Sequence, residues 1–240
     1  MIKKVIFLFF IFINSGISAQ KLHKNDLLNL EKTIYKQALQ NYDLETAQVA
    51  LYHIINLEGN QSTYLDSLAF VYFNQKKFLP TLKVANQILE KQEKLPILEI
   101  KAISLENLNA IKEAIETYEK IYKLKKDALV AYKLADLQDK LTRSAEAYAT
   151  LKSAENLKFP KGVAIIFPSE KKGETQNIPL KAAFYNLLAK TSYDLHNYDL
   201  AIKYYDQALQ IFPDFYIAKQ NKQVVELLKD KINLQKPNKN

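Results

Sequence analysis

The amino-acid sequence predicts an all-α protein, an α-α superhelix of about five helical hairpins closed by a capping helix. Two observations predict this fold. Small residues recur in two columns at steps of 33 or 34 residues, broken by one step of 54 residues, which is the signature of a helical repeat array. Glycine is also scarce, with 4 in 240 residues, where about 7% is usual. Because glycine weakens helix interiors, its scarcity fits a chain that is helical almost throughout.

The first nineteen residues have the layout of a secretory signal peptide. Lys3 and Lys4 precede the apolar run from Val5 to Ile13, and the segment ends at the small residue Ala19. The run is much shorter than the roughly 20 residues that span a bilayer. We therefore expect residues 1–19 to be a signal peptide, with cleavage before Gln20 and a periplasmic or secreted protein. The alternative is an uncleaved membrane anchor.

The two columns of small residues define the hairpins of a repeat domain over residues 20–235. Short antiparallel helices that cross closely need small side chains where their backbones meet. The column that opens each second helix contains Ala47, Thr81, Ala114, Ala147 and Ala201. The column in the middle of each first helix contains Tyr35, Ala69, Ala102, Ala135 and Ala189. Both columns keep one register, which predicts five helical hairpins.

The step of 54 residues contains an insertion of about 20 residues, at about 161–179. Val163–Phe167 is apolar and rich in β-branched residues, Gly173 lies in a polar turn-like stretch, and residues 176–178 could return. This composition predicts a β-hairpin or an ordered loop. It either packs over an exposed face of a repeat or serves as a binding element, since surface loops often carry function.

A final helix is expected between Asp214 and Gln235, where it would cap the array. Its apolar stripe should consist of Ile217, Val224, Leu227, Leu228 and Ile232, with Lys219, Lys222, Lys229 and Lys231 outside the stripe. Residues 236–240 should form a frayed tail.

The segment from Tyr185 to Pro213 resembles a tetratricopeptide repeat (TPR). In order, it contains Tyr185, Leu188-Ala189, Tyr198, Ala201, Tyr205, Ala208-Leu209 and Pro213. The TPR pattern has an aromatic residue, Leu-Gly, Ala, an aromatic residue, Ala-Leu and Pro at corresponding places. The chain departs from it in having Tyr185 for tryptophan and Ala189 for glycine. The resemblance extends in register over about residues 28–213 without the insertion, and it implies a TPR-like solenoid with a concave groove.

The residue types needed for catalysis or cofactor binding are missing. The chain has no cysteine, and its three histidines, His23, His53 and His196, do not form a metal-binding motif. Three glycines after the leader cannot build a phosphate loop or a dinucleotide fingerprint. The net charge of +8 is spread along the chain, and Arg143 is the single arginine. We expect no catalytic, cofactor-binding or metal-binding residues, no nucleic-acid partner and no stable membrane anchor.

These features favour a non-catalytic scaffold or adaptor that binds a protein or peptide in the bacterial cell envelope. A structural subunit that packs through its convex face in an envelope complex is the alternative, and an accessory to an enzyme is a third possibility. The resemblance implies that first helices line the groove. Their outward positions are Asp66, Phe70, Phe73, Glu99, Ile103, Glu106, Tyr132, Asp136, Asp139, Asn186, Lys190 and Tyr193, preceded by Lys32, Lys36 and Leu39 in the first hairpin.

The middle three hairpins contribute five acids and no base to this stripe of residues. TPR domains that clamp a terminal carboxylate instead carry lysine, arginine and asparagine there. The sequence therefore predicts a peptide partner that carries Lys or Arg beside apolar or aromatic residues. Acids would steer the encounter, and exposed aromatic residues would anchor the peptide. An ordinary solvated helix face is the alternative.

Overall fold

The computed structural model describes residues 23–59 and 61–235. The chain forms two compact units, one up to Tyr64 and one from Leu65, and each is described by itself. The predictions of a signal peptide at residues 1–19 and of a tail at residues 236–240 lie outside the described residues. Within the described ranges, no helix is long and apolar enough to cross a membrane.

The first unit is a helical hairpin. Helix α1 (Lys24–Gln40) packs against α2 (Leu44–Glu58). Asp43 caps α2 by accepting a hydrogen bond from the Thr46 amide at 3.0 Å. Hydrogen bonding by the Thr46 side chain, together with this amide, holds the pKa of Asp43 below its usual value. Glu31 occupies a position that is normally apolar, and it is buried with its carboxylate 2.8 Å from Nδ1 of His53. This contact explains why a polar residue is tolerated there.

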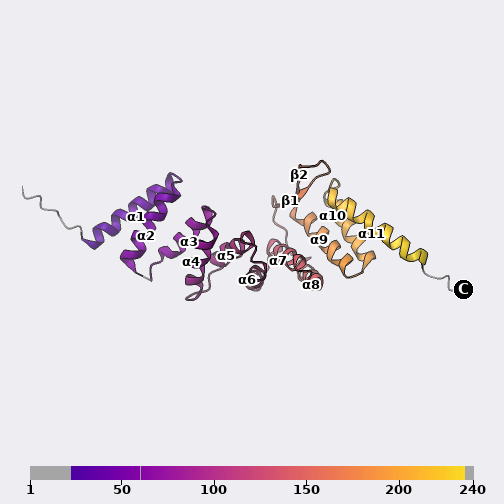
Figure 1. Ribbon diagram of the computed structural model, residues 1–240, viewed down its shortest axis with the longest axis horizontal. Helices are drawn as coiled ribbons and strands as arrows, with labels where there is room; N and C mark the ends of the chain where they lie inside the picture. The colour runs from indigo at the N-terminus through magenta and orange to yellow at the C-terminus, as the bar shows by residue number, and fades with distance from the viewer. Residues whose placement is uncertain (1–22, 60, 236–240) are drawn as a thin grey trace, which may run out of the picture. The chain divides into compact units, whose positions relative to one another are not determined.

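The second unit is itself an array of helical hairpins, and residues 23–59 and 61–235 contain eleven helices in all, which are labelled in Figure 1. Its helices are α3 (Tyr64–Asn74), α4 (Phe78–Leu89), α5 (Leu95–Asn107), α6 (Ile111–Leu124), α7 (Ala128–Lys140), α8 (Ser144–Ala154), α9 (Leu180–Asp194), α10 (Tyr198–Ile211) and α11 (Tyr216–Gln235). Within hairpins, α5 packs on α6, α7 on α8 and α9 on α10. Between hairpins, α4 packs on α5, α6 on α7, α8 on α9 and α10 on α11.

The two columns of small residues are confirmed as helix contacts. The whole second-helix column is completely buried, and so is the first-helix column from Ala69 onward. Tyr35 in the first hairpin is the exception, since it is only half-buried. An alanine at these positions lets the two helix backbones of a hairpin approach each other closely. The repeat spacing in the sequence is therefore the spacing of these helix contacts.

Each hairpin turns in the same way, at a residue with positive φ. In the last hairpin, His196 has a φ of 60°, and the Asn197 amide donates to the Ser192 carbonyl at 2.9 Å. This hydrogen bond joins residues five positions apart, as in a Schellman motif, which satisfies carbonyl groups at the end of a helix. The residues with positive φ keep the repeat spacing, and they are Tyr42, Lys76, Asn109, Thr142 and His196.

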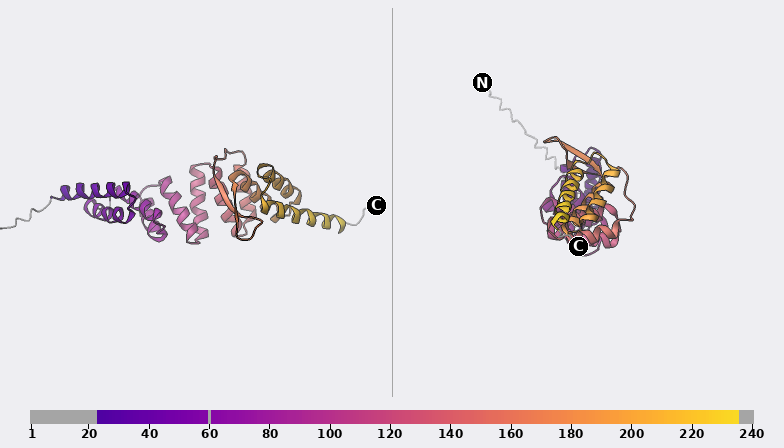
Figure 2. Two further views of the ribbon diagram at one scale, coloured as in Figure 1. Left: turned by 90° about the horizontal axis from the view of Figure 1, so that it is seen from above. Right: turned by 90° about the vertical axis from the view of Figure 1, so that its right-hand side faces the viewer.

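The insertion is an antiparallel β-hairpin, as predicted. Strand β1 (Ala164–Pro168) pairs with β2 (Thr175–Pro179), with Ile165 opposite Ile178. Both strands contact α9, and β1 also contacts α11 (Figure 2). The rings of Phe167 and Phe215 meet edge-on at 4.9 Å between centroids. Gln176 donates to the Asp214 carbonyl at 2.7 Å and accepts from the Tyr216 amide at 3.2 Å. The hairpin is therefore part of the packing that holds the start of α11.

The capping helix α11 is present, but the predicted apolar stripe is wrong at two positions. Val224 and Leu227 are 57% and 72% exposed, while Ala218 and Val225 are buried. Two of the four lysines expected outside the stripe turn toward α10, which rotates the helix relative to the predicted stripe. Lys222 pairs with Asp206 at 2.7 Å, and Lys229 pairs with Asp199.

Candidate functional site

The predicted stripe lies on α3, α5, α7 and α9, and we call its surface in the second unit the first-helix face. Phe70 and Ile103 are exposed, at 36% and 38%. Tyr132 and Asn186 are buried, at 5% and 6%, so the prediction that they line an open groove is wrong. They occupy the same repeat position on α7 and α9, and these two helices pack against each other. The eight other predicted residues of this unit are half-buried: Asp66, Phe73, Glu99, Glu106, Asp136, Asp139, Lys190 and Tyr193.

The structure brings three of the predicted residues together around a hollow between α5, α6 and α7. This central hollow has a volume of about 430 Å³. Glu99, Ile103 and Glu106 line it from α5, and Lys133 lines it from α7. Its apolar wall is completed by Ile121, Leu129 and Val130. The hollow is therefore lined by both charged and aliphatic side chains.

The two acids of the central hollow, Glu99 and Glu106, differ in their hydrogen-bond and ion-pair partners. Glu106 accepts a hydrogen bond from the Tyr118 hydroxyl and another from Lys133 at 3.2 Å. Burial, reinforced by Glu106, raises the pKa of Tyr118 far above its usual value, so Tyr118 stays a neutral donor. Glu99 has no lysine or arginine within ion-pair distance among residues 23–59 and 61–235. Glu99 is thus the carboxylate that is available to a ligand.

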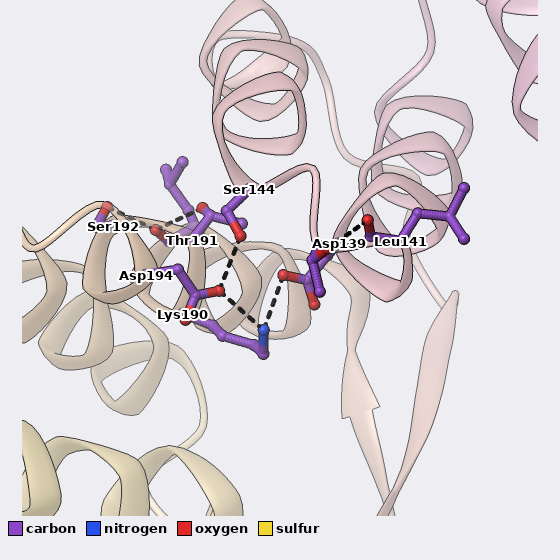
Figure 3. A network of polar contacts seen from close by, with 9 residues as sticks. Asp139, Leu141, Ser144, Lys190, Thr191, Ser192 and Asp194 are labelled. Atoms are coloured by element: carbon purple, nitrogen blue, oxygen red, sulfur yellow. Dashed lines mark hydrogen bonds and ion pairs between the residues drawn. The ribbon is translucent and has the colours of Figure 1, made fainter.

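A second hollow lies where α7 and α8 meet α9 and α10, and we call it the terminal hollow. Its volume is about 440 Å³. Lys190 spans its floor, with Nζ 2.8 Å from Asp139 and 3.0 Å from Asp194 (Figure 3). The Ser144 hydroxyl donates to Asp194 at 3.1 Å. Burial alone would lower the pKa of Lys190, but its hydrogen bonds to the two carboxylates raise it above the usual value.

Four of the five acids that the stripe places in the middle three hairpins form ion pairs with lysines. Three of these lysines lie off the stripe, and Lys190 belongs to the stripe in the last hairpin. Asp136 and Lys140 lie one turn apart on α7, while the other pairs join residues of successive hairpins. The pairs are Asp66 with Lys94 at 2.6 Å, Glu106 with Lys133 at 3.2 Å, Asp136 with Lys140 at 2.7 Å, and Asp139 with Lys190 at 2.8 Å. The first-helix face is therefore less acidic than the stripe alone predicts.

The sequence reasoning missed residues that lie outside the stripe but line the same hollows. Tyr118 and Lys133 shape the central hollow, and Asp194 shapes the terminal one. Asn221 and Val224 of α11 line a smaller hollow beside Lys190. The position of Val224 on this face could have been predicted from the sequence, because it lies one repeat of 34 residues after Lys190. The others required knowledge of which helices are neighbours.

The groups on this face are suited to binding. Among the residues that the structure describes, no three His, Asp or Glu side chains gather in a way that could hold a metal ion. His53 contacts Glu31, and His196 lies 3.3 Å from the Tyr198 hydroxyl. Both hollows instead combine hydrogen-bonding groups with apolar walls, a combination typical of recognition surfaces.

Comparisons with known proteins support a repeat fold. The tetratricopeptide repeat family model matches residues 182–215. The structure resembles "MamA 41-end from Desulfovibrio magneticus RS-1", with 15% identity, a TM-score of 0.59 and coverage of 79% of this chain and 97% of that one. It also resembles YrrB, described as a TPR protein with an unusual peptide-binding site, with 15% identity, a TM-score of 0.62 and coverage of 84% and 92%.

A second structure of MamA protein gives 14% identity, a TM-score of 0.58 and coverage of 78% of this chain and 92% of that one. No curated protein matches the sequence. Identities this low speak for the fold alone. The chain folds as an all-α, TPR-like array of helical hairpins with a small β-hairpin insertion, and its residues 182–215 match the tetratricopeptide repeat family.

Proposed function

We propose that this protein is an exported, non-catalytic scaffold of the cell envelope that binds an extended segment of a partner protein through its first-helix face. One observation carries the proposal. The residues that the repeat register places on this face line two neighbouring hollows, and each hollow combines charged groups with apolar or aromatic walls. Stacked helical hairpins offer such extended surfaces without any need for chemistry.

The central hollow favours a basic side chain. Glu99 is half-buried and has no ion pair among the described residues, while Ile103, Leu129 and Val130 lie beside it. A lysine or arginine of the partner could lay its aliphatic stem on these apolar residues and bring its charge to Glu99. The exposed ring of Phe70 on α3 would add an aromatic contact on the same face.

The likeness to YrrB is compatible with this proposal. YrrB is described as having a peptide-binding site, and the two chains share a fold at 15% identity. A shared fold does not transfer a site, so the proposal rests on the residues of this chain.

Export is the second part of the proposal, and it rests on the signal-like residues 1–19. In cells that express the full-length gene, the protein should be found outside the cytoplasm with Gln20 at its N-terminus. Mass spectrometry of the N-terminal peptide checks this directly. Recovery of chains that still begin at Met1 in the membrane fraction would point to an anchor instead.

Site-specific photo-crosslinking tests the binding face. A photoreactive phenylalanine derivative at Ile103, which is exposed in the central hollow, should crosslink to the bound segment. The same group at Lys203, exposed on α10, should not. Peptides selected from a displayed random library serve as the probe. Equal crosslinking from both positions would reject the first-helix face as the binding site.

A further inference from the structure

Helix α11 leaves Val224 and Leu227 uncovered, which are two of its three exposed large apolar side chains; the third, Leu234, lies at the end of the helix. Val224 is 57% exposed and Leu227 is 72% exposed, although ion pairs from Lys222 and Lys229 hold the same helix against α10. A terminal helix that only shields a repeat array should have a polar outer face. These two residues therefore call for another explanation.

The repeat register assigns Val224 and Leu227 to the first-helix face. Val224 and Leu227 lie 34 residues after Lys190 and Tyr193, so they continue the first-helix face by one more helix. Gln223 lies 34 residues after Ala189, at the position where a first helix meets its own second helix. Gln223 is polar and exposed. The exposed side of α11 therefore continues the register of the first-helix face, and the position that meets a second helix in the hairpins holds a polar residue in α11.

A small hollow lies beside Val224 of α11. It has a volume of about 170 Å³, between α9, α10 and α11. Tyr193, Tyr205, Val224 and Val225 line it with rings and aliphatic groups, and Lys190, Asp194 and Asn221 contribute polar groups. Small-molecule sites usually measure roughly 300–1,000 Å³, so this hollow has the size of a single side chain. It adjoins the terminal hollow, since Lys190, Tyr193 and Asp194 line both.

We infer that α11 forms the end of the peptide-binding surface, where the hollow between α9, α10 and α11 takes an apolar side chain of the bound segment. The inference rests on the proposed function and names a second anchor for the same ligand. The tyrosine rings and Val225 favour an aliphatic or aromatic side chain. Leu227 covers the neighbouring residue of the peptide, and Asn221 can hydrogen-bond its backbone. The ligand therefore carries a basic residue for the central hollow and, further along, an apolar residue for α11.

The test uses dodecapeptides selected from a displayed random library on protein purified after expression of the full-length chain. The double variant Val224→Gln with Leu227→Gln should weaken binding of the selected peptides by about tenfold or more. Both residues are exposed, so circular dichroism and melting should not change. The matched control is Leu234→Gln on the same helix, which is 87% exposed and does not line the hollow. It should alter binding by less than about twofold.

The outcomes separate the inference from the proposed function. Peptides that lose affinity with Glu99→Lys but bind the α11 double variant normally would overturn the inference alone. A library that yields no binder would overturn both. If the double variant instead changes the mass of the protein in light scattering, the apolar face of α11 joins copies of the chain, and the inference is wrong. Loss of affinity in the double variant, with an unchanged control, supports it.

Discussion

Replacing Phe215 with alanine is expected to lower the free energy of unfolding by about 3–5 kcal/mol. Phe215 is completely buried just before α11, and its ring meets that of Phe167 from the β-hairpin. Truncation removes the apolar contact and leaves a cavity between the hairpin and the start of α11. Urea denaturation followed by circular dichroism measures the loss.

Ile166→Ala provides the control, because Ile166 lies next to Phe167 on β1 but is 68% exposed. Its effect should stay within about 0.5 kcal/mol. Equal stability of the wild type and the Phe215→Ala variant would mean that the hairpin does not brace the last helices. The hairpin would then be free to act as a binding element, which was the alternative interpretation of the insertion.

The repeat period was sufficient to predict the fold. Ala102, Ala135 and Ala189 are completely buried because each lies where a first helix meets its neighbours, and this geometry recurs in every hairpin. A spacing along the chain is a local property, so it can be read from the sequence. The turn residues with positive φ follow the same spacing. They could not be predicted from residue type, because the usual residue at such a turn is glycine, whereas this chain has residues such as Tyr42 and Lys76.

The candidate site could be predicted only in part, because its chemistry depends on neighbours. The register predicted Glu99 and Ile103 as outward residues of a first helix, and both line the central hollow. It could not show that Lys133, from the next hairpin, would neutralise Glu106. Burial of Tyr132 likewise depends on how closely α7 and α9 approach. Such contacts are set by the angles between helices, which the period does not encode.

The orientation of α11 shows how a reasonable stripe can mislead. Val224 and Leu227 fit an apolar stripe at helical spacing, yet both are exposed. Long lysine side chains can lie along a neighbouring helix and still reach a carboxylate, as Lys222 does with Asp206. Hydropathy alone therefore assigned two exposed residues, Val224 and Leu227, to the core.

Reversing the charge of Glu99 is expected to have the largest effect on binding. The proposed function places a basic residue of the ligand at Glu99, and in Glu99→Lys the new ammonium would repel it. Affinity for the library-selected peptides should fall by about 10- to 30-fold. Unlike Asp139 or Glu106, Glu99 has no ion pair among the described residues, so its replacement should leave folding intact.

Glu116→Lys is the matched control, since Glu116 is an exposed acid on α6 that does not line the central hollow. It changes the net charge by the same amount and should leave affinity nearly unchanged. The most direct measurement is therefore isothermal titration of one selected peptide against the wild type, Glu99→Lys and Glu116→Lys, at low and at moderate salt. Binding through the first-helix face predicts a large loss for Glu99→Lys only, and a wild-type affinity that weakens with salt. Equal affinity of all three proteins would contradict it.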